Sequence, residues 1–210
     1  ILLDNEVHIW HANPADFAED NIIRYFKSLL SHTEIQRIQK FHFACHQHQY
    51  LVTRSLVRSV LLKYVTDISP ASWQFSTNKY GKPYISNYPF QDLFSFNISH
   101  TDDAIVLALI KNNDVGIDIE NIYRKINFQI ISQGIFSDDE VLLFKNTPLE
   151  TNRNLFFRLW TLKEAYAKAK GKGFSINFNQ FSFSFTANNR ISISFKPPLV
   201  DHPDNWQFHE

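Results

Sequence analysis

Two carboxylates spaced two residues apart are the strongest chemical signal in this sequence. Asp118 and Glu120 alternate with apolar residues in the stretch 115–120. Successive side chains of a strand point to opposite faces, so a strand here would place both carboxylates on one face, where they repel each other unless a cation lies between them. Oxygen ligands select a hard ion, Mg²⁺ before zinc. The sequence therefore predicts a strand over 115–120 with a candidate magnesium site; the alternative is a strand that runs out into solvent.

A second signal lies on a helix expected over 154–170. Trp160, Glu164 and Lys168 are four residues apart, so they share one helix face, with Lys163 beside them. Glu164 is the only acid in the basic segment 153–172. It either forms ion pairs with its basic neighbours or supplies a third carboxylate ligand. In the second case, Lys163 and Lys168 are expected to neutralise phosphate oxygens next to the metal.

Ser99 and His100 follow a strand expected over 94–98. A serine beside a histidine can act as nucleophile and base, but no G-x-S-x-G turn surrounds this pair. The same two side chains can hydrogen-bond a phosphate without further partners. Histidines at positions 42, 46 and 48 are expected to be surface or core residues, because their spacing is irregular. The sequence contains no Walker loop and no G-x-G-x-x-G motif.

The net charge is zero, but the charges are segregated along the chain. Residues 24–63 hold seven bases against one acid, Glu34, and residues 153–172 hold six bases against Glu164. Between them, residues 102–120 hold five acids against one base. Solvated helix faces are one interpretation, and a polyphosphate ligand with a divalent cation is the other. Overall neutrality argues against a nucleic-acid partner.

Composition bounds the class of protein. A chain of 210 residues with 44% apolar and 20% charged residues is typical of a globular protein with a substantial core. The longest apolar run, 104–110, is too short to span a membrane. A single cysteine, Cys45, excludes a disulfide framework, and Asp4 and Glu6 interrupt any secretory signal, so we expect a cytoplasmic protein without a membrane partner. Methionine is absent even at position 1, so we expect the native start to lie elsewhere.

The order of the expected elements predicts an α+β fold in two similar lobes. In the first lobe we expect strands over 7–10, 73–76, 94–98 and 104–110 and helices over 33–41 and 47–64. In the second lobe we expect a hairpin turn at 111–114, the strand over 115–120, a short helix from 137 to about 145, the helix 154–170 and an antiparallel pair over 181–185 and 191–195. Capping boxes at Ser31-x-x-Glu34 and Ser137-x-x-Glu140 open two of the helices, and Gly171 ends a third. We therefore divide the chain into lobes 1–112 and 113–210.

These motifs, in this order, resemble those of Sfp-type 4′-phosphopantetheinyl transferases. That family typically shows a basic N-terminal helix, G-K-P, F-N-I-S-H, a G-I-D-I-E strand and a W-x-x-K-E helix that ends in G-K-G. The matching segments here are 81–83, 96–100, 116–120 and 160–173, and the resemblance covers about residues 30–195. It implies the fold of that family: two similar α/β lobes that form an intramolecular pseudodimer, with coenzyme A and Mg²⁺ in the cleft between them.

The resemblance also implies a role for each matching side chain. It implies that Mg²⁺ is held by Asp118, Glu120 and Glu164. The coenzyme A contacts that we expect are Arg37, Lys82, Ser99, His100, Lys163 and Lys168, with Lys168 on the pyrophosphate. Arg54 and Arg58 match basic positions of the family's long N-terminal helix. The chain departs from the family at Glu34, where some members carry a lysine, and after Trp206, where the family usually adds another strand.

The activity that the resemblance implies is transfer of 4′-phosphopantetheine from coenzyme A to a serine of an acyl or peptidyl carrier protein, with release of 3′,5′-ADP, by a monomer. Glu164 and Lys168 are the expected catalytic residues. Glu164 acts either as a metal ligand or as the base, and Lys168 stabilises the leaving group, 3′,5′-ADP. Two alternatives stay open: an inactive module that binds coenzyme A or a carrier protein, and a Mg²⁺-dependent pyrophosphate hydrolase. The apolar and basic segment 121–136 is expected to dock the carrier protein, unless it packs the core of the second lobe.

Overall fold

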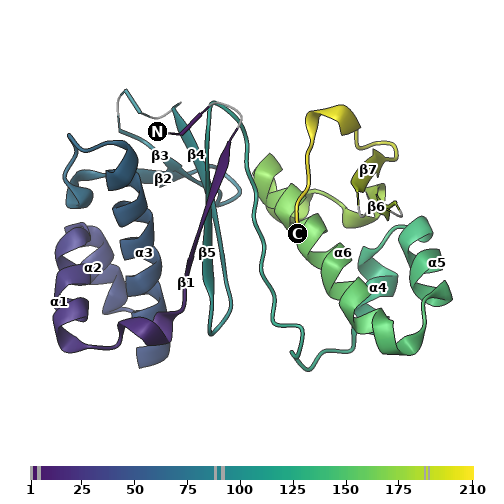
Figure 1. Ribbon diagram of the computed structural model, residues 1–210, viewed down its shortest axis with the longest axis horizontal. Helices are drawn as coiled ribbons and strands as arrows, with labels where there is room; N and C mark the ends of the chain where they lie inside the picture. Colours follow the sequence, from purple (N-terminus) through teal and green to yellow (C-terminus); the bar gives the residue numbers. More distant parts are fainter. Residues whose placement is uncertain (1, 4–5, 88, 91–92, 187, 189) are drawn as a thin grey trace.

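The computed structural model describes all residues except 1, 4–5, 88, 91–92, 187 and 189, and it has two lobes joined by a long linker (Figure 1). The first lobe contains β1 (Val7–Ala12), α1 (Asp20–Leu29), α2 (His32–Ile38), α3 (Ala44–Tyr64), β2 (Phe75–Thr77), β3 (Pro83–Ile85), β4 (Phe94–His100) and β5 (Ile105–Lys111). The second lobe contains α4 (Phe128–Ile135), α5 (Asp138–Asn146), α6 (Leu149–Lys170), β6 (Phe181–Phe185) and β7 (Ile191–Phe195). This mixed α+β architecture in two lobes confirms the predicted fold class.

A three-stranded antiparallel sheet with the order β1-β5-β4 stands in the middle of the molecule, between the helices of the first lobe and the linker (Figure 1). On one face of this sheet, Phe96 and Leu109 pack in a core with Val57 and Leu61 of α3. Burial on both faces explains why the sequence of β5 is apolar without alternation.

The opposite face of the sheet meets the linker. Ala108 and Ile110 of β5 form a small core with Val115, and Ile117 packs against it. The linker is therefore part of the packed interior between the lobes, and its position relative to the sheet is set by apolar contacts.

Aromatic side chains build the core of the second lobe around α6. Phe156 and Tyr166 of α6 are each 1% exposed, and Phe181 of β6 is fully buried against Tyr166 with ring centroids 4.8 Å apart. Much of the unusually high phenylalanine content, 20 of 210 residues, lies in this core, which gains aromatic packing beyond the area that it buries.

Most of the expected elements are confirmed, with shifted ends. Both predicted capping boxes form, at Ser31 and at Ser137, and Gly171 ends α6 in the left-handed region with a φ of 61°. β6 and β7 pair over the predicted ranges. The sequence analysis did not predict α1 and α4. Among the described helices, none is long and apolar enough to cross a membrane.

The predicted strand over 115–120 is wrong. These residues have no strand assignment, although the linker runs extended beside α6 (Figure 1). The reason is a side-chain contact: the backbone N–H of Ile117 donates to Oδ1 of Asn97 at 3.0 Å, so a β4 side chain takes the place of a neighbouring strand. The division into lobes 1–112 and 113–210 stays a prediction.

Candidate active site

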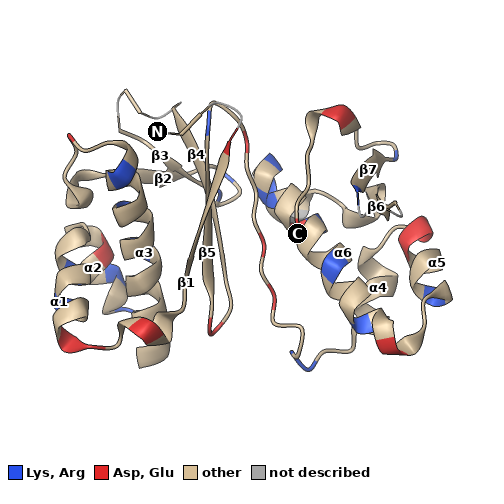
Figure 2. Cartoon of the chain, viewed as in Figure 1, with Lys and Arg blue, Asp and Glu red and all other residues tan. Residues whose placement is uncertain are grey.

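Segments from both lobes meet around one polar cavity of about 290 Å³. It is lined by Ile98, Ser99 and His100 from β4, by Asp118, Ile119 and Glu120 from the linker, and by Trp160, Glu164 and Lys168 from α6. The structure therefore brings together the residues predicted from three separate motifs. Figure 2 shows the same arrangement as charge, with acidic residues along the linker and basic residues on α6 beside it.

The linker can reach this position because residue 116 is a glycine. A Cβ atom at Gly116 would lie 1.9 Å from the carbonyl oxygen of Ala165 and 2.6 Å from the backbone nitrogen of Ala169. Any side chain would therefore force the linker away from α6. The close approach of the two backbones is what holds Asp118, two residues further on, against the face of α6.

Asp118, Lys168 and Ser99 form a connected group. The ammonium of Lys168 lies 2.5 Å from Oδ1 of Asp118 and donates to Oγ of Ser99 at 2.9 Å, and Ser99 Oγ in turn donates to the same Oδ1 at 2.8 Å. The Asp118 side chain is 6% exposed, and its second oxygen, Oδ2, is buried without a hydrogen-bond partner in the described part of the chain. A buried carboxylate oxygen without a partner is costly, so Asp118 can accept a further ligand.

The other two carboxylates, Glu120 and Glu164, line the same cavity. The indole of Trp160 donates to Oε1 of Glu120 at 3.2 Å, and the exposed Arg124 lies 3.6 Å from Oε2. Burial raises the pKa of Glu164 above its ordinary value, and the negative charges of Asp118 and Glu120 raise it further, against the opposing effect of Lys168. Glu164 therefore accepts a proton more readily than an exposed glutamate does.

The donor set fits a hard divalent cation in its chemistry. All three predicted ligands are carboxylates, Oδ2 of Asp118 lacks a partner, and a cation would relieve the repulsion that raises the pKa of Glu164. Within the described residues, however, no group of three or more His, Cys, Asp or Glu side chains stands close enough to form a ready-made metal site. The Lys168 ammonium neutralises Asp118 in this arrangement.

His100 connects this cavity to a larger one. Burial lowers the pKa of His100, the positive charge of Lys168 lowers it further, and Asp102 opposes them, so the neutral imidazole is favoured. The second cavity has a volume of about 1180 Å³, lies between α2, α3 and the β2–β3 hairpin, and shares Ile98 and His100 with the first. A ligand with a phosphate group and a larger polar body can therefore occupy both.

The wall of the second cavity combines arginines with aromatic rings. The guanidinium of Arg37 lies 5.4 Å from the ring centre of Tyr50, and that of Arg54 lies 4.4 Å from the ring centre of Phe75. Such walls suit a planar base with attached phosphates, because guanidinium groups bind phosphate and rings stack on bases. Arg37 lines this cavity, and its contact with a ligand stays a prediction.

Glu34 pairs with two of these arginines. Its Oε1 accepts from Nε of Arg54 at 2.5 Å, and its Oε2 accepts from Nε of Arg58 at 2.8 Å. Burial alone would raise the pKa of Glu34, but Arg54, Arg58 and the backbone N–H of Ser31 lower it below its ordinary value. The acid that the sequence analysis noted as a departure from the family is therefore an integral, ionised part of the cavity wall.

Lys82 joins the two lobes in this structure. Its ammonium donates to Oδ1 of Asp114 at 2.9 Å and to the carbonyl oxygen of Ala169 at 2.6 Å, near the C-terminal end of α6. Its neighbours Gly81 and Pro83 line the second cavity, whereas the Lys82 ammonium turns toward the second lobe. The predicted contact of Lys82 with a nucleotide phosphate would therefore require this ammonium to leave Asp114.

The expectation that Lys163 contacts phosphate is corrected by the structure. Its side chain is fully buried within the second lobe, where the ammonium lies 2.8 Å from Oε2 of Glu140 and donates to the carbonyl oxygens of Phe178 and Phe181. Burial lowers the pKa of Lys163 to about 8, and Glu140 opposes this effect. The side chain leaves α6 on the core side, away from the face that carries Glu164, so it cannot reach the cavity.

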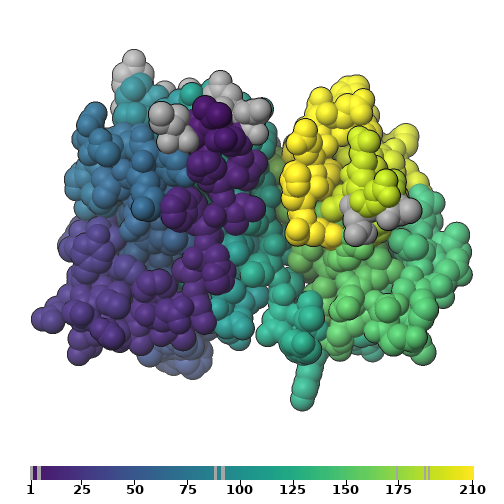
Figure 3. Space-filling model, viewed as in Figure 1, coloured from purple at the N-terminus to yellow at the C-terminus, as the bar shows by residue number. Residues whose placement is uncertain are grey.

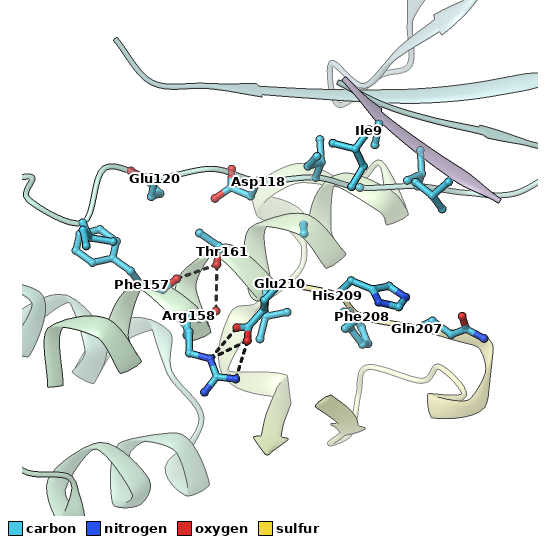
Figure 4. Close-up of a pocket in the computed structure, with 18 of the residues that line it drawn as sticks. Ile9, Asp118, Glu120, Phe157, Arg158, Thr161, Gln207, Phe208, His209 and Glu210 are labelled. Carbon is cyan, nitrogen blue, oxygen red and sulfur yellow. Dashed lines mark hydrogen bonds and ion pairs between the residues drawn. The ribbon is translucent and has the colours of Figure 1, made fainter. Parts of the chain in front are cut away.

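A third cavity, of about 860 Å³, lies between the lobes on the other side of the linker. Figure 4 shows Asp118 and Glu120 along one wall and the ion pair of Arg158 with Glu210, at 2.6 Å, along another. Figure 3 shows the same boundary from outside, with the N-terminal strand facing the C-terminal segment across it. This cavity was not predicted, because it forms between segments that are far apart in the sequence.

Sequence reasoning also missed the residues that position the site. Asn97 holds the linker, Tyr50 and Phe75 supply the rings of the second cavity, and Glu34 orders its arginines. Asn97 lies in the quoted motif F-N-I-S-H, but its side-chain role depends on the distant Ile117. The capping-box position of Glu34 was visible in the sequence, but its pairing with residues of another helix was not.

Comparisons with known proteins cover nearly the whole chain. Residues 114–209 match the model of the 4′-phosphopantetheinyl transferase superfamily, and residues 10–112 match the model of the N-terminal part of 4′-phosphopantetheinyl transferases. The 4′-phosphopantetheinyl transferase HetI of Nostoc sp. is 30% identical over 168 residues, which are 80% of this chain and 70% of HetI. The chain therefore belongs to the 4′-phosphopantetheinyl transferase superfamily and is of the Sfp type.

Two further relatives support this family. The transferase gsp of Aneurinibacillus migulanus is 34% identical over 71% of this chain, and Sfp of Bacillus subtilis is 32% identical over 68%. The matches span 59% of gsp and 61% of Sfp, so the chain covers little more than half the length of these relatives. A solved holo-(acyl-carrier-protein) synthase from Bacillus anthracis, in complex with CoA (3′,5′-ADP), has a TM-score of 0.41 and 14% identity over 49% of this chain and 91% of its own, a likeness too low to support a conclusion.

Proposed function

We propose that this protein transfers the 4′-phosphopantetheine group of coenzyme A to a serine hydroxyl of an acyl or peptidyl carrier protein and releases 3′,5′-ADP. The observation that carries the proposal is the connected pair of cavities: an arginine- and ring-lined cavity adjoins, through Ile98 and His100, a smaller one lined by three carboxylates and Lys168. The first suits an adenine nucleotide with its phosphate, and the second suits the pyrophosphate at which transfer occurs.

Binding of the donor is assigned to the residues of both cavities. Arg37 and the rings of Tyr50 and Phe75 would hold the nucleotide end, while Ser99 and the neutral His100 at the junction would hydrogen-bond the 3′-phosphate. The Lys168 ammonium would leave Asp118 for the pyrophosphate oxygens, since its side chain is partly exposed and reaches Ser99 at the end of β4.

The reaction requires a base and stabilisation of the leaving group. The serine oxygen bonds to the β-phosphorus as the bond from that phosphorus to the bridging oxygen breaks, so 3′,5′-ADP leaves with the bridging oxygen. Glu164 lines the same cavity and would serve either as the base that accepts the proton of the serine hydroxyl or as a ligand of the cation. Lys168 neutralises the charge that develops on the departing phosphate.

We assign Asp118, Glu120 and Glu164 as the residues that would hold Mg²⁺. When bound, such an ion would withdraw charge from the phosphate oxygens and order them for in-line transfer. The carboxylate chemistry and the partnerless Oδ2 of Asp118 support this assignment. Because one chain supplies all of these residues from its two lobes, we propose that the monomer is the active unit. A cytoplasmic location stays a prediction.

The decisive experiment is to weigh the acceptor. The protein is incubated with coenzyme A, Mg²⁺ and several apo carrier proteins from fatty acid, polyketide and peptide synthesis, and each carrier is analysed by mass spectrometry. We expect at least one carrier to gain the mass of one phosphopantetheine group, together with formation of 3′,5′-ADP.

The same assay separates the two alternatives. A pyrophosphate hydrolase would cleave coenzyme A without a mass gain on any carrier, and an inactive binding module would leave both coenzyme A and the carriers unchanged. Either result across all carriers would overturn the proposal. The presence of Glu164 and Lys168 together with Asp118 and Glu120 in one cavity supports the transferase, because a binding module has no need of all four.

A further inference from the structure

Glu34 is an acid in a cavity whose other charged wall residues are basic. In the described residues that line the second cavity, the charged side chains other than histidine are Glu34, Arg37, Arg54 and Arg58. An acid in the wall of a cavity that binds anions weakens the attraction for them. It can therefore set how strongly the cavity binds a phosphate group.

The contacts show which arginines Glu34 neutralises. Both of its oxygens are used, Oε1 by Arg54 and Oε2 by Arg58, and Glu34 is 7% exposed. The Arg58 side chain is 1% exposed and also donates to the carbonyl oxygen of Pro70, so Arg58 is structural. Both guanidinium groups lie over the Phe75 ring, at 4.4 Å for Arg54 and 5.1 Å for Arg58, but the Arg54 side chain is 13% exposed and so is open to a ligand.

Arg37 is the arginine of this wall that Glu34 does not engage. Its guanidinium carbon lies 5.4 Å from the centre of the Tyr50 ring. Among the described residues Arg37 has no acidic partner, so a ligand phosphate that enters this cavity meets one uncompensated arginine and a second, Arg54, whose charge is largely compensated at 2.5 Å.

We propose that Glu34 is a specificity-determining residue. By neutralising Arg54, it lowers the preference of the cavity for a donor that carries a phosphate at its nucleotide end. This inference rests on the proposed function, in which that donor is coenzyme A. It means that Arg54 adds little to recognition of the 3′-phosphate in this chain, which is left to Arg37, Ser99 and His100.

The test compares two ligands that differ in that phosphate alone. Dissociation constants for coenzyme A and for 3′-dephospho-coenzyme A are measured by calorimetry on the full chain. The readout is the dissociation constant of 3′-dephospho-coenzyme A divided by that of coenzyme A. In Glu34→Gln the ratio is expected to rise about tenfold, the order expected for one added charge-assisted hydrogen bond from the released Arg54. The substitution keeps the helix start, because Gln also serves at the third position of a capping box.

Two further variants complete the test. Glu34→Gln combined with Arg54→Gln should return the ratio to the wild-type value, because the released guanidinium is then gone. Glu150→Gln, which makes the same change of charge at an exposed site on α6, should leave the ratio at the wild-type value. An unchanged ratio in Glu34→Gln, or the same rise in Glu150→Gln, overturns the inference.

Arg54→Gln alone carries the test if Glu34→Gln does not fold. Its ratio should stay within about twofold of wild type when Glu34 already neutralises Arg54, whereas a severalfold fall shows that Arg54 reads the phosphate in the wild type and overturns the inference. Failure of the proposed function gives a different result: no carrier protein gains mass in the transfer assay, whatever the ratio of the two dissociation constants.

Discussion

Asp118 has the most unusual surroundings of any single residue in the site. One oxygen is shared by Lys168 and Ser99, and the other is buried without a partner among the described residues. We expect Asp118→Asn to lower the rate of transfer at least ~100-fold, because one oxygen of a charge-stabilising group is lost. The melting temperature should change by only a few degrees, because the amide still accepts a hydrogen bond from Ser99. Full activity of the variant at saturating coenzyme A and Mg²⁺ would contradict the assignment.

His100 lies at the junction of the two cavities. If its imidazole hydrogen-bonds the 3′-phosphate, His100→Ala should lose about 1.5–3 kcal/mol of affinity for coenzyme A and much less for 3′-dephospho-coenzyme A. His42→Ala, at an exposed histidine that lines neither cavity, is the matched control. Equal losses for the two ligands in the His100 variant would show that other residues recognise the 3′-phosphate.

The linker and α6 are the elements on which the site depends. Gly116→Ala places a Cβ atom 1.9 Å from the Ala165 carbonyl oxygen, so the linker must move and carry Asp118 away from Lys168. We expect transfer to fall below detection in the carrier mass assay. Gly134→Ala in α4 is the control: nothing lies within 4 Å of the added Cβ atom, and the change should stabilise the protein by up to about 1 kcal/mol. Similar activity of the two variants would be incompatible with the close approach.

Lys163 links α5, α6 and the segment before β6 through its contacts with Glu140, Phe178 and Phe181. Lys163→Met leaves the buried Glu140 carboxylate uncompensated, so urea denaturation should show a loss of about 3–5 kcal/mol. If the variant retains that stability, the buried pair does not hold the second lobe together. Coenzyme A binding by the folded variant should match that of the wild type. If Lys163 bound a phosphate of coenzyme A, the variant would instead bind coenzyme A more weakly.

The same lysine predicts how stability depends on pH. Burial lowers the pKa of Lys163 in the folded protein to about 8, from 10.5. Between these values the unfolded chain holds more protons on this residue than the folded protein does, so the contribution of Lys163 to the free energy of unfolding rises as the pH rises from about 8 to 10.5. The free energies of unfolding of the wild type and of Lys163→Met should diverge over this range, because only the wild type gains stability from this group as the pH rises; a constant difference would contradict the lowered pKa.

At the scale of the whole molecule, the site lies where the two lobes meet, and a carrier protein must approach it from outside. Tyr123 and Ile130 are 82% and 67% exposed in the segment that the sequence analysis proposed for docking, and Arg124 lies 3.6 Å from Glu120. The partly buried Ile126, Phe128 and Ile131 pack against the core of the second lobe, so the segment combines a packed side with an exposed apolar and basic side.

Charge complementarity mainly changes the rate of encounter. We therefore expect Arg124→Glu with Lys125→Glu to slow association with an acidic carrier protein at least ~10-fold at low salt and to weaken its salt dependence, with coenzyme A affinity near wild type. Arg24→Glu with Lys27→Glu, on the exposed side of α1, is the charge-matched control. Loss of coenzyme A affinity with unchanged carrier association would instead make this segment part of the donor site.

Local patterns in the sequence were sufficient for much of the fold. The capping boxes at Ser31 and Ser137, the strand alternation of 181–185 and 191–195 and the glycine that ends α6 depend on residues within a few positions of one another, so they are readable without a structure. The order of the motifs was likewise sufficient for the family. Three carboxylates and one lysine predicted a site for phosphate and a cation before their distances were known; they are Asp118, Glu120, Glu164 and Lys168.

Only the tertiary structure decided what each charged side chain faces. Lys163 and Lys168 both follow Trp160 on one basic helix, yet the structure buries the first against Glu140 and places the second beside Asp118, because residues five apart leave a helix in different directions. The segment 115–120 has the alternation of a strand, but Asn97 and α6 hold it as an extended linker. Pairing of Glu34 with Arg54 and Arg58 depends on how α2 packs against α3. The energies of such contacts depend on distance and burial in the folded protein, and neither quantity is a property of sequence spacing.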